Sequence, residues 1–160
     1  MELVERIRAK FPAALQEVVQ YGGETTLVVG PSHLKPLARH LKDAEGYRFL
    51  ADVSCAHWPE VGRIDAVYQV RNLESRDEVR VRVPLPEEDP EVETVSDVWR
   101  TANWLEREVY DLMGIRFLGH PDLKRVMLPE EFEGHPLRKE FPMQGDDAWR
   151  NYLAPEAETD

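Results

Sequence analysis

Three segments in the middle of the chain alternate apolar and polar side chains with a period of two residues. They span residues 47–53, 64–71 and 78–83, and this alternation is typical of β-strands that bury one face of a sheet. A further strand is expected at the β-branched run 25–29. The short polar link at 74–77 predicts a hairpin between the last two strands. The sequence therefore predicts a mixed or antiparallel sheet of about four strands.

Helices are expected before and between these strands. Apolar residues recur at helical spacing from Leu3 to Val18, and a second amphipathic stretch lies between Ser32 and Gly46. Residues 84–90 are rich in proline and acid and are predicted to form a loop. This order of elements favours an α+β fold, with helices packed on the sheet. A charged helix and an irregular C-terminal segment are expected to follow this sheet.

The charge and the cysteine content exclude several classes of function. The formal net charge of −11 at pH 7 opposes binding to nucleic acid and to anionic membrane surfaces. The single cysteine, Cys55, cannot form an internal disulfide or supply the four ligands of an iron–sulfur cluster. The sequence has neither the glycine-rich dinucleotide motif nor a P-loop. We therefore expect no cofactor in this chain.

The sequence also bears on location and on domain organisation. No apolar run approaches the ~20 residues that cross a bilayer, and residues 1–10 lack the apolar core of a signal peptide. A cytoplasmic protein is expected, with any membrane contact made through a partner. One α+β domain is predicted at 1–142, followed by an acidic tail at 143–160.

A helix with two different faces is predicted from Ser96 or Asp97 to Met113, ended by Gly114. Its apolar stripe, assigned to the core, consists of Val98, Ala102, Leu105, Val109 and Leu112. Its other face carries Arg100, Trp104, Arg107, Glu108 and Asp111. Arg107 and Asp111 are four residues apart and are expected to pair. A charged face is usually solvated, but the aromatic residues among these charges favour an interface with another protein.

Two Gly-His-Pro turns follow the helix, and three interpretations of them stay open. His57, His120 and His135 could bind a metal together with Cys55, although their spacing fits no standard zinc pattern. Either of the last two histidines could act as an acid or base with one of the acidic residues Glu106, Glu108 and Asp111. In the third interpretation, each glycine supplies a positive φ and each histidine bonds nearby backbone.

The stretch NWLEREVYDLMGIRFLGHPDLKRVML, followed by EGHPLRKEFP, closely resembles the signature of the 30 kDa (C) subunit family of NADH-quinone oxidoreductase (respiratory complex I). The resemblance covers roughly residues 47–142, with the signature region at 99–142. The family usually has an acidic residue near His57, where this chain reads Cys-Ala-His-Trp-Pro. Carried over by position, the residues expected to shape turns and contact other subunits are Trp104, Glu106, Arg107, Glu108, Asp111, Gly114, Gly119, His120, Pro121, Gly134, His135, Pro136, Leu137, Arg138 and Lys139.

The resemblance implies a cofactor-free structural subunit of the hydrophilic arm of a proton-pumping complex. In that family, electrons pass from NADH through FMN and iron–sulfur clusters of partner subunits to quinone. The implied neighbour is the D subunit, which is similar to the large subunit of hydrogenases. The implied location is the cytoplasmic side of the inner membrane, as a peripheral part of the complex, and the isolated subunit is expected to be non-catalytic. The alternatives are the equivalent subunit of a membrane-bound hydrogenase or plastoquinone reductase, and a stand-alone metal-binding enzyme.

Overall fold

The computed structural model describes residues 2–142, so the predicted acidic tail at 143–160 lies outside the described residues. The helices are α1 (Leu3–Lys10), η1 (Pro31–His33), α2 (Leu34–Asp43), η2 (Pro59–Val61) and α3 (Ala102–Met113). The strands are β1 (Leu15–Tyr21), β2 (Glu24–Val29), β3 (Phe49–Trp58), β4 (Arg63–Arg71), β5 (Glu78–Pro86), β6 (Glu91–Glu93) and β7 (Arg116–Leu118). This order confirms the predicted α+β class.

The main sheet is mixed, as predicted, but it has five strands instead of about four. Its strand order is β1-β2-β5-β4-β3. β2 and β5 run parallel, and every other neighbouring pair is antiparallel. The predicted hairpin between β4 and β5 is confirmed, with Arg71 opposite Glu78. β6 and β7 form a separate parallel pair that the sequence did not predict.

The extra strand, β1, occupies residues that were predicted to continue the first helix. The helix ends at Lys10, before Pro12, and Leu15 to Tyr21 pair with β2. The apolar spacing fitted a helix, but the two glycines that follow β1 have positive φ and form a two-residue turn that folds β1 back onto β2. Pairing along β2 therefore overrides the helical pattern.

β5 continues into the proline-rich stretch that was predicted to be a loop. β4 pairs with β5 as far as Pro86, whereas β2 pairs with β5 only up to Arg82. Pro84 and Pro86 therefore lie where β5 has lost one neighbour. A proline is tolerated there because its missing N–H leaves no unmade ladder bond on that side.

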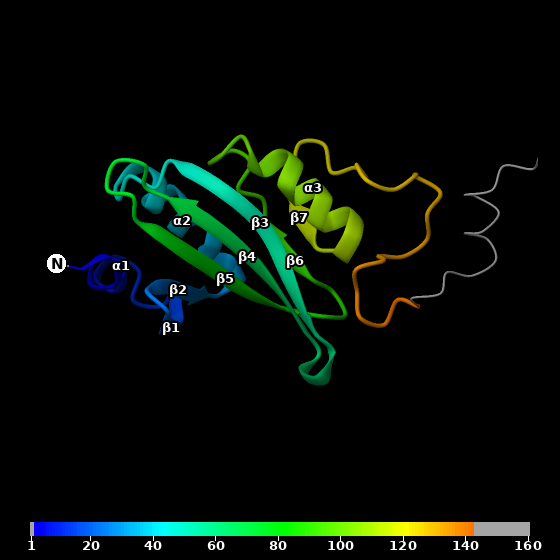
Figure 1. Ribbon diagram of the computed structural model, residues 1–160, viewed down its shortest axis with the longest axis horizontal. Coiled ribbons are helices and arrows are strands. Elements are labelled where there is room, and N and C mark those ends of the chain that lie inside the picture. The colour runs from blue at the N-terminus through cyan, green and yellow to red at the C-terminus, as the bar shows by residue number, and fades with distance from the viewer. Residues whose placement is uncertain (1, 143–160) are drawn as a thin grey trace, which may run out of the picture.

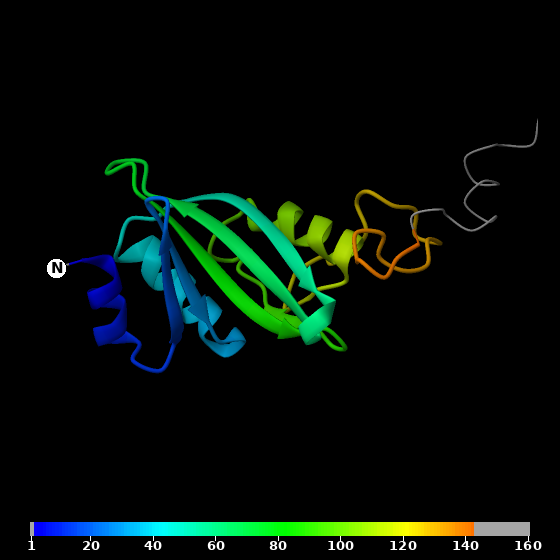
Figure 2. The same cartoon turned by 60° about the horizontal axis from the view of Figure 1, so that its bottom comes forward.

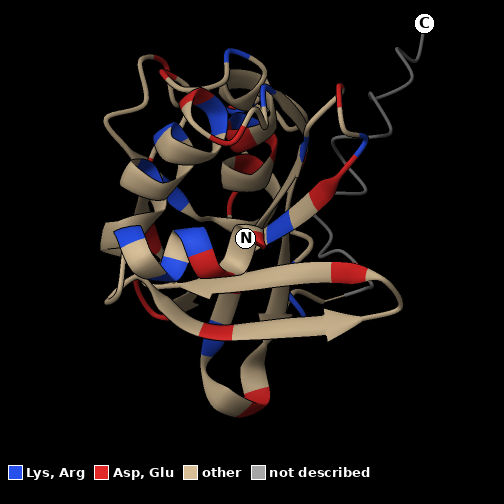
Figure 3. Ribbon diagram, turned by 90° about the vertical axis from the view of Figure 1, so that its left-hand side faces the viewer, with Lys and Arg blue, Asp and Glu red and all other residues tan. Residues whose placement is uncertain are grey.

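The core lies between one face of the main sheet and the helices (Figures 1 and 2). α2 contributes Leu37 and Leu41, and α3 contributes Ala102 and Val109, to one continuous cluster of buried residues. Alternate residues of β4 and β5 complete this cluster, which places both helices on the same sheet face. Figure 3 faces the α1 side of the molecule. Acidic and basic residues are interspersed along the ribbon drawn there, without a uniformly basic region.

α3 begins later than predicted, at Ala102 and not at Ser96 or Asp97. The N–H of Ser96 is held by the hydroxyl oxygen of Thr94, and a tight turn on the carbonyl of Val95 precedes the helix. In that turn the indole of Trp99 is 4% exposed and donates to the carbonyl of Tyr47 at 3.1 Å. The predicted stop is confirmed, because Gly114 has a φ of +76°.

After β7 the described chain has no helix or strand. Residues 119–142, here called the wrapping segment, run back along α3 and beyond its end (Figure 1). Between residues 2 and 142, the helices are too short or too polar to cross a bilayer.

Candidate functional site

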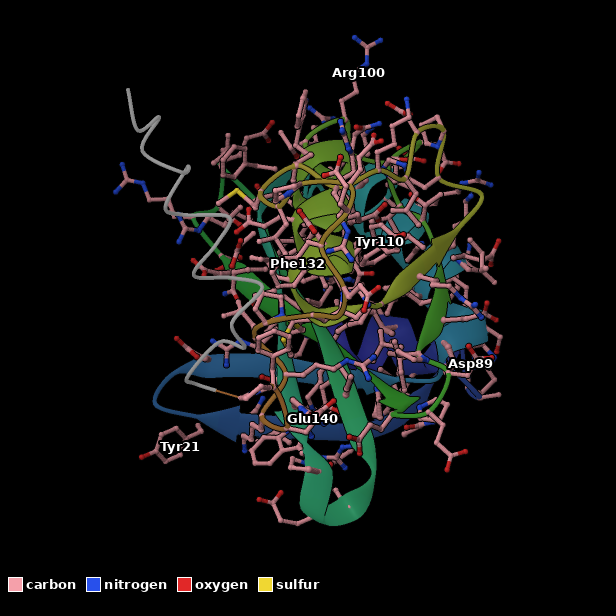
Figure 4. All side chains as sticks on the ribbon, turned by 90° about the vertical axis from the view of Figure 1, so that its right-hand side faces the viewer. Tyr21, Asp89, Arg100, Tyr110, Phe132 and Glu140 are labelled. Atoms are coloured by element: carbon pink, nitrogen blue, oxygen red, sulfur yellow. The ribbon has the colours of Figure 1, made fainter. Side chains whose placement is uncertain are left out.

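The signature residues come together where the wrapping segment covers α3. Figure 4 looks onto this end of the molecule, with Phe132 in front of α3 and Arg100 projecting away from the body. Two classes of side chain are present. One class is buried and fixes the segment to the helix, and the other faces outward.

Asp111 is the main buried anchor. Its side chain is fully buried, and Oδ2 accepts the backbone N–H groups of Val126, Met127 and Leu128 at 2.8–3.0 Å. Oδ1 accepts Nη1 of Arg125 at 2.7 Å. One carboxylate therefore holds four consecutive residues of the wrapping segment.

The pKa of Asp111 reflects this arrangement. Burial alone would raise it, but the N–H groups of residues 126–128 and the Arg125 guanidinium together lower the pKa below its ordinary value. The carboxylate is therefore ionised at neutral pH. The predicted pairing of Asp111 with Arg107 was wrong, because Arg107 donates instead to the carbonyl of Lys124 at 3.2 Å.

The two Gly-His-Pro turns bind backbone, as one of the three interpretations proposed. His120 Nε2 lies 3.0 Å from the carbonyl of Asn103, and its Nδ1 accepts the N–H of Asp122 at 3.0 Å. His135 Nδ1 lies 2.9 Å from the carbonyl of Asp111. Gly119 and Gly134 both have positive φ. These contacts occupy the histidines in holding the wrapping segment.

The end of α3 is closed by the second turn. The N–H of Leu137 donates to the carbonyl of Leu112 at 3.1 Å, and Arg138 Nε donates to that of Met113 at 2.8 Å. These carbonyls lie in the last turn of the helix, where they have no partner within it. A basic side chain is also favourable at the negative end of the helix dipole. Arg138 thus acts as an internal brace of this chain.

Glu106 is buried on the opposite side of α3. It is 0% exposed, its Oε1 accepts the N–H of Val95 at 2.8 Å, and its Oε2 is hydrogen-bonded to the Thr94 hydroxyl. Burial raises the pKa of Glu106 to about 7. Of the pairs in the acid–base interpretation, the structure brings Glu106 close to His120, with Oε2 3.9 Å from Nε2, which is beyond hydrogen-bond distance. Glu108 is exposed and Asp111 binds a different segment.

The metal hypothesis for Cys55, His57, His120 and His135 is not supported by their positions. Within residues 2–142, the one group of three or more possible ligand atoms consists of His57, Glu87 and Glu140. Burial raises the pKa of Cys55 to about 12, which keeps its thiol protonated.

The His57 group fixes the end of the wrapping segment to the sheet. Its Nε2 lies 2.8 Å from Glu87, while its Nδ1 accepts the N–H of Lys139 at 3.1 Å and lies 3.4 Å from Glu140. Because Nδ1 accepts the Lys139 N–H, the ring proton lies on Nε2 and is donated to Glu87, so both ring nitrogens are engaged in hydrogen bonds. The Lys139 ammonium lies 5.6 Å from the centre of the Trp58 ring. No sequence motif indicated Glu87 or Glu140 as partners of His57.

Three large apolar side chains face outward from the same site. Trp104 is 64% exposed, Met127 64% and Leu137 60%. The Arg107 guanidinium lies 4.6 Å from the Trp104 ring centre, in a cation–π contact. Trp, Arg and Met are enriched in protein interfaces. Met127 was not among the predicted residues, although it lies within the signature stretch, and only that position could have suggested it.

The chain is similar in sequence to a known protein family over most of its length. Residues 27–147 match the family described as "Respiratory-chain NADH dehydrogenase, 30 Kd subunit". The C subunit of NADH-quinone oxidoreductase from Geotalea uraniireducens is 41% identical over 145 residues, which covers 90% of this chain and 88% of the relative. The C subunit of the same enzyme from Moorella thermoacetica is 46% identical over 118 residues, covering 74% of this chain and 80% of the relative.

Solved structures show the same fold. A structure described as Nqo5 of the trypsin-resistant fragment (1-134) aligns with a TM-score of 0.65 and 39% identity, covering 76% of this chain and 96% of that one. A chain of the membrane-bound sulfane sulfur reductase, an archaeal respiratory membrane complex, aligns with a TM-score of 0.79. It covers 99% of this chain and 93% of that one, but at 24% identity it is evidence of a shared fold alone.

Proposed function

The chain belongs to the family of the 30 kDa subunit of respiratory-chain NADH dehydrogenase, and on that premise we propose that it is a cofactor-free assembly subunit of a proton-pumping NADH-quinone oxidoreductase. In this role it binds neighbouring subunits of the hydrophilic arm and holds them in register. FMN and the iron–sulfur clusters are assigned to partner subunits, which carry electrons from NADH to quinone. The isolated chain is expected to have no turnover.

One observation carries this proposal: the wrapping segment is fixed to α3 by buried polar contacts yet presents apolar side chains outward. A long segment without helix or strand is uncommon in a compact domain and is usually either functional or a disordered linker. Here Asp111 holds residues 125–128 of the segment, and Arg138 holds it near its C-terminal end. The rigid support fits a surface that must keep Trp104, Met127 and Leu137 in fixed positions for a partner.

The proposed partner is the D subunit, the neighbour that is similar to the large subunit of hydrogenases. The support is the family signature, whose residues form this surface or brace it. The proposed location is peripheral, on the cytoplasmic side of the inner membrane, with the membrane reached through the complex. An equivalent role in a related membrane-bound complex is the second candidate, because an archaeal respiratory membrane complex contains a chain of the same fold.

The experiment is co-purification of the complex through a tag on this chain, with two surface variants and one control. Trp104→Ala and Leu137→Asp are expected to reduce recovery of the D subunit and of NADH:quinone activity, because these side chains are proposed to contact the partner. Both are largely exposed in the single chain, so the substitutions are expected to leave its fold intact. Leu73→Asp is the control, since Leu73 is 67% exposed in the β4–β5 hairpin.

The outcomes of this experiment distinguish the two candidate functions. Loss of partners with an unchanged melting temperature of the isolated chain supports the docking role. Normal recovery with both variants contradicts it. Recovery of a hydrogenase or sulfur-reducing complex, without NADH oxidation, selects the second candidate.

A further inference from the structure

Glu106 lies in the core beneath α3 without a fixed positive partner. Among residues 2–142, the one group within 4 Å of its carboxylate that could carry a positive charge is the His120 imidazole, at 3.9 Å. The hydrogen bonds of His120 define its tautomer. Its Nδ1 accepts the N–H of Asp122, so the ring proton lies on Nε2, which donates to the carbonyl of Asn103. This arrangement is the neutral imidazole, so Glu106 has no compensating charge there.

A chain of hydroxyl groups connects Glu106 to the surface. Thr94 is 2% exposed, and its Oγ1 contacts Glu106 Oε2 on one side and Ser96 Oγ, at 2.8 Å, on the other. Thr94 Oγ1 also accepts the N–H of Ser96 at 3.1 Å. Ser96 is partly exposed, so the chain runs from a fully buried carboxyl group to a residue at the edge of the core.

The hydroxyl of Thr94 has one proton and two lone pairs, and these fit either protonation state of Glu106. When Glu106 is ionised, Thr94 donates to it and accepts from both the hydroxyl and the N–H of Ser96. When Glu106 is protonated, it donates to Thr94, and Thr94 donates to Ser96 Oγ while still accepting the Ser96 N–H. Every group keeps its hydrogen bonds in both states, with only the direction of the chain reversed.

We propose that Glu106, Thr94 and Ser96 form a buried proton-binding site, in which Glu106 holds the proton and the two hydroxyl groups carry it to and from the solvent. In uptake, Ser96 Oγ accepts a proton from a hydronium ion, which is left as water, and passes its own proton to Thr94 Oγ1. Thr94 then passes its original proton to Glu106 Oε2. One proton enters, one carboxylate is neutralised, and both hydroxyl groups are restored. Release is the reverse sequence.

The other ionisable groups around the site leave it free to titrate near neutral pH. On β4, burial and the charge of Glu106 raise the pKa of Tyr68 well above its ordinary value, so Tyr68 stays neutral. In the turn before α3, Asp97 raises the pKa of Glu106, while Lys35 of α2 lowers it. Lys35 and Arg39 both pair with Asp97, which offsets these charges against one another. Burial is the largest effect and raises the pKa of Glu106 to about 7.

The site is independent of the docking role, because it needs only the folded chain. Its consequence is reversible proton uptake at neutral pH by a group that joins α3 to the end of β6. The carboxyl group keeps its bond to the N–H of Val95 in either state. The proton can therefore come and go without separating these elements.

The test is a pH titration of the ¹³C resonance of the Glu106 side-chain carboxyl in the full chain. The resonance is assigned through its own side-chain and backbone carbons, so the assignment does not depend on a variant. The expected midpoint is about pH 7. The reference for comparison is the ordinary glutamate pKa of about 4.3.

Two variants test whether the hydrogen-bond chain reverses its direction on protonation, or whether burial alone raises the pKa of Glu106. Ser96→Ala removes the acceptor that Thr94 needs when Glu106 is protonated, so it is expected to lower the midpoint. Thr94→Val removes the donor to the ionised form, which makes the stronger hydrogen bond, so it is expected to raise the midpoint. Thr94→Ser keeps the hydroxyl and is expected to restore the original midpoint.

Shifts in these opposite directions establish the proposal. A Glu106 midpoint near the ordinary glutamate value of about 4.3 overturns it, and so does a midpoint that Ser96→Ala leaves unchanged. Shifts in the same direction for Ser96→Ala and Thr94→Val also overturn it, because they indicate altered packing.

Discussion

Replacing Asp111 by asparagine tests how the wrapping segment is held. The substitution keeps the size of the side chain but removes its charge, and it places an amide N–H against either the Arg125 guanidinium or the N–H groups of residues 126–128. Removing one partner of a buried charge pair costs about 3–5 kcal/mol. Because these contacts are local to the wrapping segment, we expect the loss to appear as local opening of this segment, with little effect on the sheet.

Amide hydrogen exchange measures that opening directly. A loss of about 3–5 kcal/mol corresponds to roughly 10²- to 10⁴-fold faster exchange at Val126, Met127 and Leu128, at about tenfold for each 1.4 kcal/mol. Val81, in the centre of the sheet, is expected to keep its protection. Glu108→Gln, an exposed change on the same helix, is the matched control and should alter neither.

The protonation of Asp111 gives the same experiment a pH dependence. Its pKa is lower in the folded chain than in the unfolded chain, so the stabilisation is present above the ordinary aspartate pKa of about 3.9. It is lost as the pH falls through the lower folded value. Unchanged exchange at residues 126–128 in Asp111→Asn would refute the anchoring role. Equal acceleration at Val81 would show that Asp111 supports the whole fold.

Two further predictions concern α3. Ionisation of Glu106 should lower the free energy of unfolding by about 3 kcal/mol between pH 4.5 and 7, because its pKa is raised in the folded chain. Glu106→Gln should remove this contribution from the pH dependence measured by urea unfolding. An unchanged pH dependence in the variant would contradict it. Gly114→Ala should lower the stability measured by thermal unfolding by at least about 1 kcal/mol, since Gly114 has a φ of +76° and an added Cβ would lie 2.5 Å from the His135 ring. Gly62→Ala is the control for backbone strain alone, because Gly62 also has a positive φ but has open space around it. Equal losses in the two variants would exclude a role for the His135 contact.

The part of the fold that the sequence predicted is the part governed by local periodicity. Alternation placed β3, β4 and β5, and Gly114 marked the end of α3. β1 was missed because the spacing from Leu3 to Val18 also fits a helix, and the pairing that decided its structure involves residues further along the chain. Tertiary pairing therefore decided between two locally acceptable structures.

The candidate site was predicted by its residue types, but its contacts were not. Helical spacing suggested that Arg107 pairs with Asp111. Asp111 instead binds the Arg125 guanidinium and the backbone N–H groups of residues 126–128, and no side-chain pattern reveals the backbone contacts. The sequence also did not distinguish outward from inward signature residues. Glu106 and Asp111 proved to be buried, whereas Trp104 and Leu137 face outward. The predicted contact with other subunits stays a prediction for the outward residues.

Side-chain footprinting of the isolated chain and of the assembled complex tests the docking role most directly. Hydroxyl-radical labelling reports the exposure of Trp104, Met127 and Leu137, which are all more than half exposed in the single chain. We expect these three residues to lose reactivity on assembly, while Tyr21, 85% exposed at the far edge of the sheet, serves as a comparison. Full reactivity of Trp104, Met127 and Leu137 in the assembled complex would contradict the assignment of this surface to docking between subunits.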